Sequence, residues 1–131
     1  MPERSCTSAV LGIMLISGAY DRAHHALVMA VSAASLDRPV VLFATHGGLH
    51  ALCRDWSGLV GSDADKTFTA RGVVGFASLQ ETLPSLGVRL MACEAGLLAT
   101  ALPAAMLLDT VERVGVPTFL ASVGTGQMLS I

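Results

Sequence analysis

Apolar residues run continuously through several short segments of this chain instead of alternating with polar ones. Four runs are typical of strands, and a fifth is weaker: residues 10–16, 40–44, 88–92 and 128–131, with 111–114 as the weaker candidate. Continuous apolarity indicates strands that are buried on both faces, as in a parallel sheet covered by helices. We therefore expect an open, mostly parallel sheet of about five strands.

The first apolar run is followed by the pattern of a helix. Apolar residues recur every three or four positions from Ala23 to Ala34, and Asp21 stands where a side chain can cap the helix N-terminus. Pro39 follows this helix and begins the second strand, because proline cannot continue a helix. The helix is apolar on nearly every side, so we expect it to face both the sheet and another subunit.

Later helices and one polar segment complete the predicted order. Residues 75–86 form a helical pattern that stops at Gly87, and a short helix lies between Pro117 and Gly124. Residues 58–72 are the most polar stretch, which we interpret as a surface excursion or lid. Strands that alternate with helices predict right-handed β-α-β units in an α/β domain.

Composition narrows the classes of partner. The 131 residues suit a single domain, and Lys+Arg 8 against Asp+Glu 10, without a basic run, argues against nucleic-acid binding. Hydrophobic residues make up 53% of the chain. The longest apolar stretch, residues 95–108, is shorter than the roughly 20 residues of a membrane span, and Pro103 interrupts it. We expect no membrane association, and a homo-oligomer that covers the excess apolar surface.

The N-terminus and the cysteines bear on the compartment. The apolar block at residues 9–16 is short for a signal peptide, and the charges before it cancel. Cys6, Cys53 and Cys93 form no CxxC pair, and any one disulfide would leave an odd thiol, which suits a reducing environment. We therefore expect a cytoplasmic protein whose residues 1–8 form a mobile tail.

Residues that could carry chemistry gather in three segments that follow predicted strands. Ligands and reactive groups collect at the carboxyl ends of strands in an open parallel sheet. Residues 17–25, 45–50 and 93–96 follow the first, second and third main strands. Together they contain seven reactive or ionisable side chains of interest: Asp21, His24, His25, His46, His50, Cys93 and Glu94.

Cys93 stands between a predicted strand and a predicted helix. Free N–H groups and the helix dipole at a helix start favour an anion, so the thiolate, which attacks or carries sulfur, should form there more readily than in mid-helix. The alternative is an inert, buried cysteine that acts as a small hydrophobe. Glu94 beside the thiol opposes a negative sulfur unless its side chain points away, and we interpret it as a helix-start residue.

The surroundings of Cys93 resemble a known family. The segment Leu86-Gly87-Val88-Arg89-Leu90-Met91-Ala92-Cys93, followed by Glu94-Ala95-Gly96-Leu97, is similar to the strand, cysteine and helix of DsrE/DsrF-like proteins, which include sulfur-relay subunits of sulfur oxidation and tRNA thiolation. Further short similarities cover most of the chain, at residues 39–43, 71–76, 116–120 and 127–131.

This resemblance implies both a fold and an activity. The fold is a three-layer α/β/α sandwich with about five mostly parallel strands. The activity is sulfurtransferase-like: the cysteine at Cys93 receives sulfane sulfur as a persulfide and passes it to an acceptor thiol. Sulfur donor and acceptor proteins would be the partners, no cofactor is needed, and the homo-oligomer would be a trimer, hexamer or dimer.

Two rival hypotheses remain open on the sequence. In one, the protein is a non-catalytic ligand-binding or assembly subunit. In the other, His46 and His50, spaced i, i+4 on a helix, form a metal site with Cys93. We also expect His24 or His46 to share a crevice with Cys93, with Asp21 and Glu94 nearby, whereas Cys53 serves packing.

Overall fold

The apolar runs form one five-stranded sheet in the computed structural model, which describes residues 9–131. The strands are β1 (Leu11–Leu15), β2 (Val40–Ala44), β3 (Arg89–Cys93), β4 (Val111–Val114) and β5 (Gln127–Ser130). They lie in the order β4-β3-β2-β1-β5, and every neighbouring pair is parallel. The open parallel sheet is therefore confirmed. The expected mobile tail at residues 1–8, with Cys6, lies outside the described residues.

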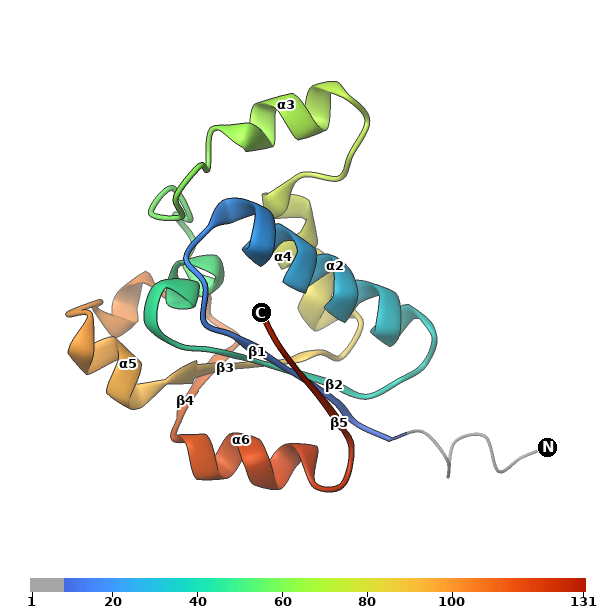
Figure 1. The fold of residues 1–131 in the computed structure, drawn as a ribbon, viewed down its shortest axis with the longest axis vertical. Coiled ribbons are helices and arrows are strands. Elements are labelled where there is room, and N and C mark those ends of the chain that lie inside the picture. Colours follow the sequence, from blue (N-terminus) through green and yellow to red (C-terminus); the bar gives the residue numbers. More distant parts are fainter. Residues whose placement is uncertain (1–8) are drawn as a thin grey trace.

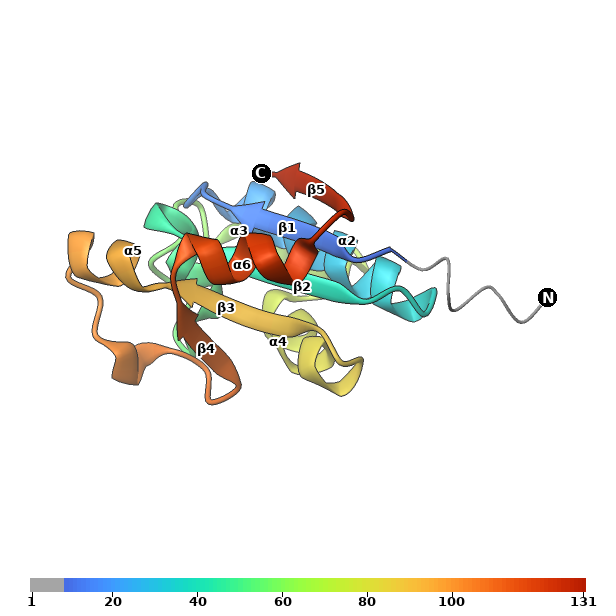
Figure 2. The same ribbon diagram turned by 90° about the horizontal axis from the view of Figure 1, so that it is seen from below.

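Helices cover both faces of this sheet and give it three layers. They are α2 (Tyr20–Ser35), α3 (Ala64–Ala70), α4 (Phe76–Ser85), α5 (Glu94–Ala99) and α6 (Val116–Val123), with 3-10 turns η1 (His46–Leu52) and η2 (Ala104–Met106). Helices α2 and α4 lie on one face, with α3 beyond them, and α6 lies on the other (Figures 1 and 2). The positive φ of +79° at Gly87 ends α4 as predicted, because glycine adopts this conformation readily.

Side chains of β3 alternate between two apolar clusters. Leu90 and Ala92 join the large cluster under α2 and α4. Met91 and Cys93 belong to a smaller cluster that includes Phe119 of α6. Because successive strand residues point to opposite faces, the side chain of Cys93 faces the α6 layer.

The start of α2 corrects one expectation. The helix begins at Tyr20, and Asp21 does not cap it: its carboxylate accepts a hydrogen bond from the backbone N–H of Arg22. The N–H of Tyr20 instead donates to the carbonyl of Val60, at 2.8 Å. A distant backbone carbonyl thus satisfies the helix end that a nearby side chain was expected to satisfy.

The segment after β2 corrects a second expectation. It is the 3-10 turn η1, in which residues three apart share a face, so the i, i+4 spacing of His46 and His50 does not align them. Cys53 stands just beyond it, fully buried, in an isolated bridge to Leu107. The packing role predicted for Cys53 agrees with this position.

The polar segment at residues 58–72 is an excursion held against α2. It contains α3, most of whose residues are exposed. The Tyr20 hydroxyl donates to Asp65 Oδ1 at 2.5 Å, and the N–H of Phe76 donates to the same oxygen at 2.8 Å. One carboxylate thus joins three separate elements: α2, α3 and the start of α4.

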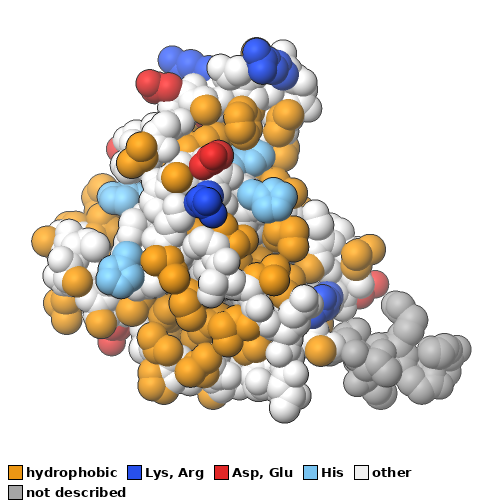
Figure 3. Space-filling model, viewed as in Figure 1, with side chains coloured by type: hydrophobic (Ala, Val, Ile, Leu, Met, Phe, Trp, Pro, Cys, Tyr) orange, Lys and Arg blue, Asp and Glu red, His pale blue; other side chains and the backbone are white. Residues whose placement is uncertain are grey.

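Several large apolar side chains remain exposed on the described surface. Leu98, Leu36 and Val60 are 84%, 79% and 76% exposed. Apolar side chains also gather over α6 and the adjoining strands (Figure 3). No helix within residues 9–131 has both the length and the apolarity needed to cross a membrane. Self-association through these surfaces stays a prediction.

Removal of the Tyr20 hydroxyl should loosen the excursion. Burial raises the pKa of Tyr20, and the hydrogen bond and negative charge of Asp65 raise it further, so the hydroxyl donates throughout the neutral range. Tyr20→Phe should lower the free energy of unfolding by about 1.5 to 3 kcal/mol, the range for a hydrogen bond to a charged group. Hydrogen exchange should also quicken across residues 60–75.

The matched control is Asp63→Asn, which changes an exposed neighbouring carboxylate with no side-chain hydrogen bond to the described residues. It should alter neither quantity. Unchanged exchange in Tyr20→Phe would show that Tyr20 does not hold the excursion.

Candidate functional site

Cys93 ends β3 and caps the N-terminus of α5. The backbone N–H of Gly96 donates a hydrogen bond to Cys93 Sγ at 3.3 Å, and Cys93 itself keeps extended backbone angles. This is the geometry of an N-cap, in which a side-chain acceptor satisfies a free N–H of the first turn. The same N–H can stabilise a negatively charged sulfur at this position.

Aromatic and aliphatic side chains shelter the sulfur from the α6 side. Cys93 shares its cluster with Val41, Phe43, Met91, Phe119 and Val123. The rings of Phe43 and Phe119 are stacked, with centroids 4.8 Å apart. Only 5% of Cys93 is exposed. The thiol therefore lies just beneath the surface, at the end of a central strand.

Gly96 packs so tightly against the segment after β2 that its residue type is constrained. A Cβ atom at this position would lie 2.9 Å from Thr45 Oγ1, 3.2 Å from Leu49 Cδ1 and 3.3 Å from the backbone N of His46. Thr45 and Leu49 are both buried, so neither has free space to move into. The missing side chain lets α5 approach, which fixes the N–H that binds the sulfur.

His46 and Glu94 lie near the first turn of α5, but in different ways. His46 is exposed and has a φ of +50°, so its backbone bends sharply where the chain leaves β2. Its backbone N faces Gly96. Glu94 follows Cys93 directly and its side chain is exposed. The carboxylate is therefore well solvated beside the buried thiol.

His24 and Asp21 contact groups other than Cys93. His24 is buried, its Nε2 donates to the Val74 carbonyl at 2.8 Å, and its ring meets Phe68 edge to face at 4.9 Å. It therefore holds the excursion, on the face of the sheet opposite the Cys93 side chain. Asp21 is exposed at the start of α2. The contacts of His24 are thus away from the sulfur, and the two hollows that Asp21 lines do not include Cys93.

Metal ligands do not converge in the part of the chain that is described. No three His, Cys, Asp or Glu side chains within residues 9–131 are placed to hold one ion. The ring of His50 instead packs on the backbone of Gly58, where a Cβ atom would lie 2.4 Å from Nδ1. The arrangement of this histidine is explained by packing.

Cys53 provides an internal comparison for Cys93. It is fully buried, and its Sγ lies 3.5 Å from the Leu49 carbonyl, to which it donates. Burial raises the pKa of the Cys53 thiol, and the negative charge of Asp55 raises it further. Cys53 is thus a donor inside the core, whereas Cys93 is an acceptor at its edge.

Two residues of this site, Thr45 and Gly96, are not predicted from the sequence pattern. That pattern assigns no role to Thr45 and marks Gly96 only as part of the helix start. The available signal was the glycine at the third position after Cys93, where the N–H that reaches an N-cap side chain is placed. Thr45 carried no such signal, because its contact with Gly96 is tertiary.

Comparisons with known proteins place the fold. No family model matches the chain, and no curated protein matches its sequence. The ychN protein from E. coli matches it in structure with a TM-score of 0.71 at 15% identity, over 94% of this chain and 99% of that one. MTH1491 from Methanobacterium thermoautotrophicum, a protein of unknown function, gives 0.62 at 18% identity over the same shares. These likenesses show a shared fold.

Substitution of Gly96 should separate α5 from the segment after β2. Gly96→Ala should lower the free energy of unfolding by about 1 to 3 kcal/mol, the usual cost of overpacking. Gly115→Ala is the matched control at the same end of the sheet, because a Cβ there comes no closer than 3.4 Å to Pro117. Thr45→Ala should restore part of the stability lost in Gly96→Ala, as urea unfolding would show. Equal stability of Gly96→Ala and the wild type would contradict the close contact.

Proposed function

We propose that this protein is a sulfur carrier in which Cys93 receives sulfane sulfur and passes it to an acceptor thiol. The observation that carries the proposal is the Gly96 N–H aimed at Cys93 Sγ, at the point where the chain leaves a central strand. The resemblance of residues 86–97 to DsrE/DsrF-like proteins supports it, and the α/β fold is compatible with that resemblance.

The transfer consists of two displacements at sulfur. The Cys93 thiolate attacks the outer sulfur of a donor persulfide or of a polysulfide, so that a new S–S bond forms and the donor S–S bond breaks. The donor leaves as a thiolate, or as a polysulfide that is shorter by one sulfur. An acceptor thiolate then attacks the outer sulfur of the Cys93 persulfide, and the Cys93 sulfur leaves as a thiolate. Electrons and atoms balance without a further oxidant, and Cys93 returns to its starting state. Donor and acceptor proteins are part of this proposal.

The protein supplies shelter and an anion-binding N–H. With Cys93 only 5% exposed beside Phe43 and Phe119, bulk solvent has little access to a bound outer sulfur. The Gly96 N–H is already in place, so no reorganisation is needed when charge develops on sulfur. The proposed activity is therefore sulfurtransferase-like: the protein carries one sulfur per cycle, and its thiol is regenerated when the sulfur is passed on.

The low exposure of Cys93 favours a second candidate function. A thiol that is 5% exposed and satisfied by one N–H can be purely structural, a cap that holds α5 in place. The protein would then be a non-catalytic binding or assembly subunit. Reactivity in the folded state separates the two candidates.

Polysulfide loading followed by intact-mass measurement and peptide mapping is the direct test. Wild type and Cys53→Ser should both gain sulfur on Cys93, and Cys93→Ser should lose that gain. Cys53 should load far more slowly, because burial and Asp55 raise the pKa of its thiol and leave less thiolate at neutral pH. If folded wild type gains sulfur only on other cysteines, Cys93 is a structural cap and the carrier proposal fails.

A further inference from the structure

The threonine that follows β2 carries a hydroxyl that no described residue binds. Thr45 is 9% exposed, and its Oγ1 forms no hydrogen bond with any residue that the structure describes. Every fully enclosed polar side-chain atom in residues 9–131 has a partner, so part of the small exposed area of Thr45 belongs to this oxygen. A mostly buried hydroxyl without a partner costs free energy, and this one is free to bind a ligand.

Thr45 and Cys93 stand side by side on neighbouring strands. In the register of β2 with β3, Ala44 stands opposite Ala92, so the next pair along the strands is Thr45 and Cys93. Thr45 keeps an extended backbone, with φ of −145° and ψ of 163°. Its N–H also donates to the Leu15 carbonyl at 3.0 Å, as a strand residue would. The strand geometry therefore continues to the level of the sulfur.

The side chains of Thr45 and Cys93 leave the sheet on the same face. Phe43 and Met91 precede them by two residues and belong to the cluster on the α6 side. Because strand side chains alternate with a period of two, Thr45 and Cys93 also face that side. Thr45 Oγ1 lies 2.9 Å from the position of a Cβ at Gly96, whose N–H donates to Cys93 Sγ at 3.3 Å. The hydroxyl and the sulfur thus lie next to the same glycine.

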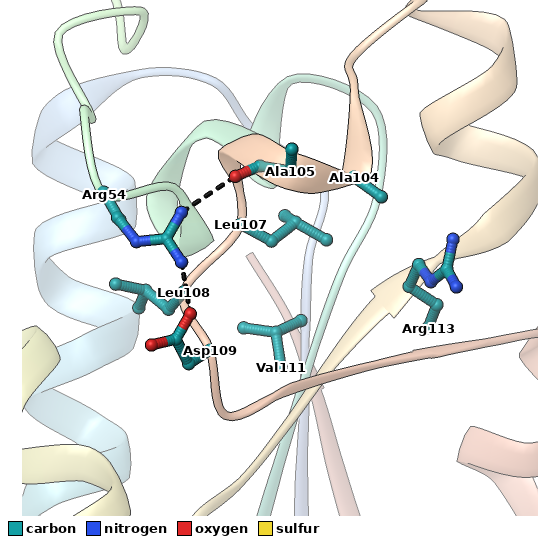
Figure 4. A pocket seen from close by; sticks show the side chains of 8 residues that line it. All are labelled: Arg54, Ala104, Ala105, Leu107, Leu108, Asp109, Val111 and Arg113. Carbon is teal, nitrogen blue, oxygen red and sulfur yellow. Dashed lines mark hydrogen bonds and ion pairs between the residues drawn. The ribbon is translucent and has the colours of Figure 1, made fainter.

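Two hollows near this end of the sheet do not include the sulfur. One, of about 370 Å³, lies beside β4, and its lining includes Arg113 but neither Cys93 nor Thr45 (Figure 4). The other, of about 300 Å³, is lined in part by Glu94 and also lacks both residues. A sulfur atom added to Cys93 therefore starts outside these hollows, and groups at the strand ends must hold it.

We infer that the Thr45 hydroxyl holds the outer sulfur of the Cys93 persulfide, an inference that rests on the proposed carrier function. When the persulfide is deprotonated, its negative charge lies on the outer sulfur, whereas the Gly96 N–H meets the inner one. Adjacent strands are about 4.8 Å apart, and the outer sulfur lies about 2 Å beyond Sγ, which brings it within reach of the neighbouring hydroxyl. The site therefore has two donors, one for each sulfur atom.

This hydrogen bond favours the loaded state over the empty one. In the empty protein the hydroxyl of Thr45 has no partner among the described residues, and loading of Cys93 supplies an acceptor. A hydrogen bond to a charged acceptor is stronger than one between neutral groups. The hydroxyl keeps its proton and forms no covalent bond, so its role is to retain and orient the outer sulfur until an acceptor thiolate attacks.

The test measures how readily iodoacetamide alkylates the outer sulfur of polysulfide-loaded protein at a series of pH values. Peptide mapping identifies the product by the extra sulfur on the Cys93 peptide. Thr45→Val and Thr45→Ala should raise the pH midpoint of the reaction by about one unit, because loss of the donor disfavours the anion about tenfold. Thr45→Ala also avoids any contact of a valine methyl with Gly96. Thr45→Ser keeps the hydroxyl and should behave as wild type, as should Thr110→Val, the matched control at an exposed threonine before β4.

Loading and alkylation together separate the failure of this inference from the failure of the carrier proposal. If wild type gains no sulfur on Cys93, the carrier proposal fails and the role of Thr45 fails with it. If Cys93 is loaded in every protein and the Thr45→Val and Thr45→Ala midpoints equal that of wild type, the carrier function stands and the role of Thr45 is overturned. An equal rise in Thr45→Ser would also overturn it, because packing and not the hydroxyl would then set the midpoint.

Discussion

The site depends on one close backbone approach, that of Gly96 to the residues that follow β2. Because Gly96 has no Cβ, the first turn of α5 can lie against Thr45 and the backbone of His46. That approach sets the start of α5, and the start of α5 sets the direction of the N–H that meets the Cys93 sulfur. A thiol at a strand end becomes an N-cap only because the neighbouring chain segments pack at backbone distance.

A second close backbone approach, between Gly47 and Gly18, lies next to that of Gly96. A Cβ at Gly47 would lie 2.9 Å from the backbone of Gly18, so the segments after β1 and β2 also meet without intervening side chains. Three central strands therefore end in segments that brace one another. These contacts position the N–H that the proposed chemistry needs, and the sulfur is shielded by the packed side chains of Phe43 and Phe119.

The three inner strands were predictable because they are buried on both faces, so continuous apolar runs such as residues 40–44 marked them directly. The edge strand β4 contains Glu112 and Arg113 and is largely exposed, so its apolar signal was weaker. Gly87 and Gly124 marked helix ends for local conformational reasons. What the sequence could not show were the tertiary partners. The Val60 carbonyl, and not the Asp21 side chain, accepts a hydrogen bond from the first N–H of α2. The ring of His24 donates to the Val74 carbonyl, away from the crevice in which we expected it. Each depends on contacts between residues about 40 or more apart in the sequence.

The Gly96 N–H holds the sulfur of Cys93, and the amide signal of Gly96 in NMR reports this contact directly. We expect polysulfide treatment of the reduced protein to shift the Gly96 amide proton among the most of all assigned amides, and Cys93→Ala to remove the shift. A Gly96 amide signal that does not move while sulfur is added to Cys93 would show that this N–H does not hold the sulfur.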